Sequence, residues 1–338
     1  MDALADALEL TRALVALETP TGSEGPATDL LAGALARAGY RTVRQQVSPG
    51  RDNLLAYREA PALVFSTHLD CVPPYVPLSE DAESIRGRGA CDAKGLAAAM
   101  VAAAERLAGA GERRIGLLFL VGEENGSDGA RIANALEPRG RFLINGEPTE
   151  NQLSIGQKGS LRVELHATGR AAHSAYPEEG ESAIEALLDT IASIRAMPLP
   201  HDPLLGSSTL NVGLIRGGVA PNVLAPEASA EILIRTVGPT DGLRAAIRAL
   251  TRPGVAVSFP LELPSHRGGT APKGWDTTVV SYGSDLPFLT EWGECYQLGP
   301  GTIRVAHSPG EHIRKADLLR GVDLYVRLAR DLLAREAS

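Results

Sequence analysis

Histidine and acidic residues follow three separate apolar segments of the chain, each at the point where the segment ends. They are His68 and Asp70 after 62–66, Glu123 and Glu124 after 114–121, and Glu147 after 141–145. Imidazole and carboxylate groups are, with thiolate, the usual protein ligands of zinc. One such group is more often a solvated strand end than a ligand, but the repetition at three strand ends predicts a divalent-metal site.

Two further residues extend this set. Asp92 lies in the turn G-A-C-D-A-K-G, and His307 lies far along the chain in A-H-S-P-G-E-H. A carboxylate in a glycine-flanked turn can bridge two metal ions, although a single aspartate there more often forms an Asx-type turn or a helix N-cap. The side chains of Glu123 and Glu124 point in different directions, so one can hold metal while the other transfers protons.

The elements that must position these residues follow an α/β pattern. The apolar runs at 62–66, 114–121 and 141–145 are typical of strands buried on both faces, and helices are expected at 93–108 and 315–335. Open α/β sheets place their sites beyond the carboxyl ends of their strands. We therefore expect the three strand ends to meet.

The middle of the chain has a different order. Strands are expected at 160–168, 208–215, 226–237 and 255–263, with helices at 181–196 and 240–250. The order β-α-β-β-α-β predicts a ferredoxin-like unit. We expect one metal-binding domain formed by 1–156 and 267–338, with a compact second domain inserted at 157–266. His173 lies alone in this insert, and a lone histidine is usually structural.

The composition excludes several classes of partner. The 338 residues are 44% hydrophobic and 22% charged, as in an ordinary globular protein, and the net charge is −8. That charge disfavours a nucleic-acid or anionic-membrane partner. No secretory signal pattern opens the chain and no apolar run reaches 18 residues, so we expect a cytoplasmic protein. Three cysteines, without a C-x-x-C pair, favour packing over disulfides or metal ligation.

Taken in chain order, these motifs resemble one known family. The motifs are H-x-D at 68–70, G-x-x-D-x-K-G at 89–95, G-E-E at 122–124, G-E-P-T at 146–149 and the late His307. The chain resembles, over nearly its whole length, the dinuclear-zinc amidohydrolases and peptidases that include acetylornithine deacetylase, succinyl-diaminopimelate desuccinylase, aminoacylase and a glutamate-releasing carboxypeptidase. Many of these proteins have a second glycine after Gly95, where this chain has Leu96.

The resemblance implies a fold and a set of roles. The fold would be a zinc-aminopeptidase-like α/β domain carrying the inserted ferredoxin-like α+β lid. Two zinc ions per subunit, which cobalt or manganese can replace, would be bound by His68, Asp92 and Glu147 and by Asp92, Glu124 and His307. Asp70 would support His68, Glu123 would be the general base and then the general acid, and His173 would polarise the scissile carbonyl. Asn222, Arg235 and Gly301 match positions that contact the substrate.

The implied reaction is hydrolysis of the amide bond of an N-acyl amino acid, which releases a carboxylic acid and a free amino acid in amino-acid biosynthesis. The alternative is a metallo-carboxypeptidase or dipeptidase that acts on small peptides, because the two activities share the metal core. A homodimer formed through the lid domain is expected. A non-catalytic protein that keeps the fold is disfavoured, since all the chemical residues are present.

Overall fold

The computed structural model of the chain describes residues 6–335, so residues 1–5 and 336–338 of the predicted catalytic domain lie outside it. The chain forms two compact units. The first comprises Met1–Ile155, Arg267–Thr278 and Ser284–Ser338, and the second comprises Gly156–His266 and Val279–Gly283. The short segment 279–283 is therefore a part of the second unit that follows the insert in sequence.

The first unit is built on a mixed sheet whose strands run in the order β1-β2-β6-β3-β7-β17-β8-β15, with β16 paired to β8. The strands are β1 (Arg41–Ser48), β2 (Arg51–Tyr57), β3 (Leu63–His68), β6 (Ile115–Leu120), β7 (Phe142–Asn145), β8 (Leu153–Gln157), β15 (His266–Arg267), β16 (Thr277–Val280) and β17 (Glu294–Gln297). A smaller sheet has the order β18-β5-β4, formed by His312–Arg314, Ser84–Arg86 and Ser79–Glu80.

The three strands that precede the predicted ligands are neighbours. β3 pairs in parallel with β6 on one side, where His68 lies opposite Leu120, and with β7 on the other, where Ser66 lies opposite Asn145. Every residue of these strands is buried. Parallel neighbours end at the same edge of a sheet. The strand-end argument from the sequence is thus confirmed for these strands.

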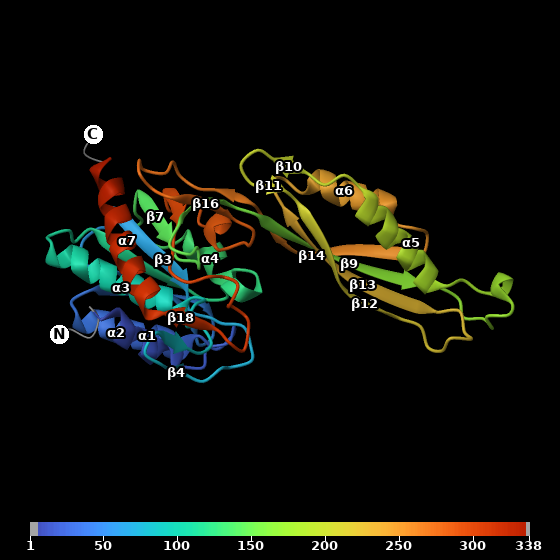
Figure 1. Cartoon of the computed structure of the whole chain (residues 1–338), viewed down its shortest axis with the longest axis horizontal. Helices are drawn as coiled ribbons and strands as arrows, with labels where there is room; N and C mark the ends of the chain where they lie inside the picture. The colour runs from blue at the N-terminus through green and yellow to red at the C-terminus, as the bar shows by residue number, and fades with distance from the viewer. Residues whose placement is uncertain (1–5, 336–338) are drawn as a thin grey trace. The chain divides into compact units, whose positions relative to one another are not determined.

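Helices cover both faces of this sheet because side chains alternate along each strand. Leu63 and Phe65 of β3 join the core of the face packed by the four long helices, and Val64 joins the core of the opposite face. The four helices, seen together in Figure 1, are α1 (Ala7–Val15), α2 (Gly25–Arg37), α3 (Lys94–Gly109) and α7 (Lys315–Ala334). The opposite face has the shorter α4 (Asp128–Ala133) and the single turns η2 (Glu123–Asn125) and η4 (Leu286–Phe288).

The second unit has the predicted ferredoxin-like order. Its elements are β9 (Gly159–Thr168), η3 (Pro177–Glu179), α5 (Ala183–Ala196), β12 (Thr209–Gly217), β13 (Glu227–Thr236), α6 (Asp241–Leu250) and β14 (Val255–Leu263). The sheet order is β12-β13-β9-β14, and all pairs are antiparallel. Both helices pack on one face (Figure 1), which explains the alternating burial along β13. A small hairpin of β10 (His201–Asp202) and β11 (Gly206–Ser207) was not predicted.

Within residues 6–335, none of the helices combines the length and the apolar character that crossing a membrane requires.

Candidate metal centre

Five of the residues predicted from the sequence meet in two groups in the first unit. His68, Asp92 and Glu147 form one group, and Asp92, Glu124 and His307 form the other. Within each group the candidate ligand atoms all lie within 4.8 Å of one another. Asp92 belongs to both groups, so a single carboxylate stands between two ligand sets.

The two oxygens of Asp92 face different histidines. Oδ1 lies 3.2 Å from Nε2 of His68, and Oδ2 lies 3.4 Å from Nε2 of His307. Nε2 of His307 also lies 2.9 Å from Oε1 of Glu124. A carboxylate with one oxygen toward each group has the geometry of a ligand that bridges two metal ions, as the sequence resemblance implies.

His68 is oriented by Asp70 in a way that the sequence predicted only in part. Nδ1 of His68 donates to the backbone carbonyl of Asp70 at 3.0 Å, and Oδ1 of the Asp70 carboxylate lies 3.4 Å away. A proton held on Nδ1 leaves the lone pair of Nε2 for a metal ion. The imidazole is thus preorganised for ligation mainly by a main-chain oxygen.

The Asp70 carboxylate has a second function. Its oxygens accept hydrogen bonds from the backbone amides of Glu123 and Glu124, both at 3.1 Å, and from the hydroxyl of Thr21 at 2.7 Å. It therefore holds the turn η2, which carries the predicted proton-transfer residue and a predicted ligand. Thr21 carried no signal in the sequence, because it lies in a loop without recognisable ligand spacing.

Gly122 lets that turn begin at the end of β6. Its φ is +79°, and a Cβ at this position would lie 1.8 Å from Oδ1 of Asp128. Arg51 binds the Asp128 carboxylate at 2.6 Å and also pairs with Glu24 at 2.9 Å, whose side chain is fully buried. The turn is packed against this ion-pair network, in which Glu24 is fully buried and Asp128 is partly exposed.

The donor set fits divalent cations, and the electrostatics of the site support this. Burial raises the pKa of Glu123 and of Glu147 well above the usual range, and neighbouring carboxylates raise both further. Hydrogen bonds with Asp92 and Glu124 raise the pKa of His307 to about 10. Without another positive charge, these raised pKa values favour the protonated forms of Glu123, Glu147 and His307. Divalent ions would supply that charge and leave the carboxylates ionised and the imidazoles neutral.

One buried carboxylate in this region was missed. Asp285 is buried, which raises its pKa to about 7, and its charge in turn raises the pKa of Glu123 and Glu147. It lies in S-D-L-P, where nothing in the local sequence marks it. The cysteines behave as expected for packing, since Cys71 and Cys91 are buried and burial raises the pKa of the Cys71 thiol to about 12.

The predicted substrate residues of the insert belong to the second unit. His173 is exposed, and its Nδ1 accepts a hydrogen bond from the amide of Ala175 at 3.1 Å. The exposed Asn222 lies beside it, since its carbonyl accepts from the amide of Ser174 at 3.0 Å. Arg235 is half-buried on β13 and donates to Oγ of Ser160 at 2.7 Å.

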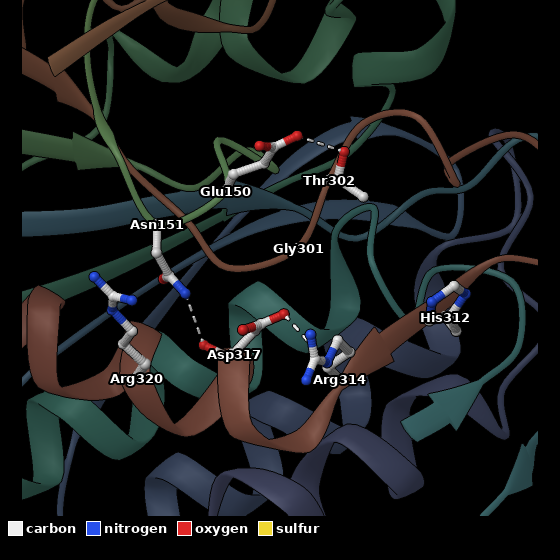
Figure 2. A pocket seen from close by; sticks show the side chains of 8 residues that line it. All are labelled: Glu150, Asn151, Gly301, Thr302, His312, Arg314, Asp317 and Arg320. Carbon is white, nitrogen blue, oxygen red and sulfur yellow. Dashed lines mark hydrogen bonds and ion pairs between the residues drawn. The ribbon is translucent and has the colours of Figure 1, made fainter. Parts of the chain in front are cut away.

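Gly301, the remaining predicted substrate residue, lines a cavity of about 320 Å³ in the first unit. The lining residues, drawn in Figure 2, are Glu150, Asn151, Gly301, Thr302, His312, Arg314, Asp317 and Arg320. Among these residues, Thr302 donates a hydrogen bond to Glu150 at 2.8 Å. None of the five candidate metal ligands lines this cavity. Gly301 also lies against Cys91, because a Cβ added to Gly301 would lie 2.5 Å from Sγ of Cys91.

The first unit thus has a mixed sheet with imidazole and carboxylate groups beyond its parallel strands, and the chain also contains a ferredoxin-like unit. The family model of peptidase family M28 matches residues 53–154 of this chain. The family model of the M20 peptidase dimerisation domain matches residues 155–252.

Individual relatives extend the match to the whole chain. A peptidase M20 domain-containing protein of Schizosaccharomyces pombe is 37% identical over 334 residues, which cover 95% of this chain and 83% of that protein. A probable carboxypeptidase of Aspergillus fumigatus is 36% identical over 98% of this chain and 88% of its own length. The crystal structure of an aminopeptidase from Bacillus cereus has the same fold, with a TM-score of 0.81 at 19% identity over 98% of this chain and 99% of that one.

The chain belongs to the M20 peptidase family, and it is a hydrolytic enzyme of the metallopeptidase class. Its two groups of candidate ligands fit the divalent metal that this class implies. The family that the sequence motifs indicated is therefore confirmed. The narrower prediction of a deacylase acting on N-acyl amino acids is not decided by these relatives, whose names are those of peptidases.

Proposed function

We propose that this enzyme uses two zinc ions to hydrolyse the amide bond next to a free carboxylate, and that its substrates are short peptides cleaved at their C-terminal end. The observation that carries the proposal is the pair of ligand groups that share Asp92. The similarity to proteins named probable carboxypeptidases, at 34–36% identity over nearly the whole chain, supports the choice of peptides.

Glu123 is the proposed proton-transfer residue. When bound, the metal ions lower the pKa of a water molecule and polarise the substrate carbonyl. Glu123 belongs to neither ligand group and lies on the same turn as Glu124. It accepts the proton of the water as the new C–O bond forms, and it returns that proton to the amine nitrogen as the C–N bond breaks.

His173 is proposed to stabilise the negative charge that develops on the carbonyl oxygen. The amide of Ala175 donates to its Nδ1, so the neutral imidazole carries its proton on Nε2. A donor of this kind is what an oxyanion requires.

Arg235 and Asn222 are proposed to bind the substrate carboxylate. Among residues 6–335, no acidic side chain is paired with the Arg235 guanidinium, and burial lowers its pKa. A half-buried guanidinium without an acidic partner favours an anionic ligand, because its planar fork matches a carboxylate. Gly301 is proposed to contribute to substrate binding, because it lines the cavity described above.

The second candidate is the deacylation of N-acyl amino acids, including N-acetyl and N-succinyl compounds. The same carboxylate site and the same amide chemistry serve both reactions, and the motif set resembles that of deacetylases and desuccinylases. A panel of N-blocked dipeptides, dipeptides and N-acyl amino acids separates the two candidates by kcat/KM. C-terminally amidated peptides test the requirement for the carboxylate, and we expect them to be poor substrates.

The catalytic assignment is tested by Glu123→Gln, with the exposed Glu137→Gln as the matched control. We expect Glu123→Gln to lower kcat by at least about 10²–10⁴-fold while its zinc content stays near two ions per chain. Glu137→Gln should change neither quantity. Turnover by Glu123→Gln close to that of the wild type would exclude Glu123 as the general base.

We also propose that the enzyme is a homodimer formed through the second unit. The match to a peptidase dimerisation domain covers most of this unit. Its α5 and its edge strand β12 expose large apolar side chains, including Leu188, Leu214 and Ile215. Exposed apolar patches and unpaired strand edges are typical of protein interfaces.

A further inference from the structure

The carboxylate of Glu311 lies buried beneath the turn that presents Asp92. Glu311 follows His307 by four residues, just before β18, and is 1% exposed. Neither ligand group includes it. In the segment A-H-S-P-G-E-H, only the first histidine, His307, matches a family motif, so the sequence assigns no role to Glu311.

Within the described residues 6–335, every hydrogen bond of this carboxylate goes to the turn at 88–92. Oε1 accepts from the backbone amides of Gly89 at 2.8 Å and of Cys91 and Asp92, both at 3.2 Å. Oε2 accepts from Nη1 of Arg88 at 2.6 Å. One oxygen thus accepts from three amides of the turn, and the last of these belongs to Asp92 itself.

Main-chain hydrogen bonds also connect this turn to Glu311. The amide of Gly87 donates to the carbonyl of Glu311 at 3.1 Å, and the amide of Lys94 closes the turn by donating to the carbonyl of Gly89 at 2.8 Å. The Arg88 side chain is only 4% exposed. Water has little access to this region, so the three amides have no alternative partner if the carboxylate is removed.

We propose that Glu311 is a positioning residue of the metal centre, which fastens the Asp92 turn to the loop that carries His307. The inference rests on the proposed metal centre. Asp92 and His307 are 215 positions apart in the chain, and Oδ2 of the first lies 3.4 Å from Nε2 of the second. A shared ligand must be held within about 0.5 Å of its place to serve two ions, and this requires rigid support.

The test compares Glu311→Ala with a conservative variant and with a matched control. Glu311→Gln keeps an oxygen that can accept from the three amides. Glu105→Ala removes another largely buried carboxylate of the first unit, one paired with Arg58 at 2.9 Å on the helix α3. Metal-free protein is titrated with Zn²⁺ against a chromophoric chelator and with Co²⁺ by visible absorption, while circular dichroism monitors folding.

The expected result is a rank order. Glu311→Ala should weaken Zn²⁺ binding by about 10–100-fold and alter the Co²⁺ spectrum, because supporting residues of metal ligands have effects of this size. Glu311→Gln should recover most of the affinity, and Glu105→Ala should bind as the wild type does. Wild-type affinity in Glu311→Ala, no recovery in Glu311→Gln, or an equal loss in Glu105→Ala would overturn the proposal.

Two further outcomes have their own tests: a Glu311→Ala variant that does not fold, and a wild-type protein that does not bind Zn²⁺. If Glu311→Ala does not fold, Glu311→Asp replaces it, since the shortened carboxylate cannot reach Arg88 and all three amides together. A tenfold loss of Zn²⁺ affinity in folded Glu311→Asp supports the proposal, and wild-type affinity overturns it. Failure of the wild-type protein to bind Zn²⁺ would instead overturn the metal centre itself, and the role of Glu311 with it.

Discussion

Replacing Gly122 by alanine tests whether the backbone conformation of this glycine, after the end of β6, positions the turn η2 and the proposed proton-transfer residue Glu123. Gly122 has a φ of +79° and immediately precedes Glu123. An added Cβ would lie 1.8 Å from Oδ1 of Asp128 and 2.7 Å from Nη2 of Arg51. The methyl group therefore meets both a backbone conformation that favours glycine and an ion pair in its path.

The size of the effect follows from these two contributions. A left-handed conformation costs a residue with a Cβ about 1–2 kcal/mol. Asp128 must also rotate away from Arg51, which breaks hydrogen bonds of 2.6 and 3.1 Å. The Asp128 side chain is 45% exposed, so losing this pair costs only about 1 kcal/mol. The total is about 2–3 kcal/mol of unfolding free energy.

Urea unfolding followed by tryptophan fluorescence measures this cost in the first unit, because both tryptophans, Trp275 and Trp292, belong to it. Gly39→Ala is the matched control, since Gly39 has a φ of +84° and open space around an added Cβ. We expect the control to lose about 1–2 kcal/mol with an unchanged kcat. Gly122→Ala should lose more and should lower kcat by at least about tenfold, because a displaced Glu123 is a poorer proton acceptor.

A double-mutant cycle with Asp128→Ala tests whether the collision with Asp128 causes the loss of stability in Gly122→Ala. In an Asp128→Ala background the carboxylate at 1.8 Å is gone and only Nη2 of Arg51, at 2.7 Å, remains close, so adding Gly122→Ala should cost less than it does in the wild type. An undiminished cost in that background, or equal losses in the two single alanine variants, would show that the collision with Asp128 is not what constrains this position.

Four other results are expected. Arg51→Met should destabilise the first unit by about 3–5 kcal/mol in urea, because the fully buried Glu24 loses its partner; the exposed Arg44→Met should cost about 0–1 kcal/mol, and similar losses in both would contradict this. A chelator should abolish hydrolysis and lower the thermal midpoint, with both restored by Zn²⁺, as mass action requires; activity that survives dialysis against chelator would argue against a metal-dependent reaction. Arg235→Ala should raise KM about tenfold or more with kcat little changed, whereas an unaltered KM would exclude it as the carboxylate site. Ile215→Glu should convert the proposed dimer to a monomer in sedimentation velocity, and an unchanged sedimentation coefficient would exclude this part of β12 from the interface.

Much of the architecture could be predicted from the sequence because its signals are local. A continuous apolar run identifies a strand buried on both faces, and the ends of three such runs located His68, Glu124 and Glu147 at one edge of the sheet. The order of strands and helices in the insert was sufficient for a ferredoxin-like sheet, because that order admits few antiparallel arrangements. The chemistry of the motifs then indicated the family.

The supporting contacts were decided by tertiary structure alone. Asp70 was expected to orient an imidazole, but its carboxylate also holds the amides of Glu123 and Glu124, more than 50 positions away. Glu311 reaches a turn some 220 positions earlier, and Asp285 adds a buried charge that no motif marks. Residue type and spacing report what a segment does with its own neighbours in the chain. Which buried carboxylate meets which backbone amide depends on how distant segments pack, and no periodicity within either segment records it.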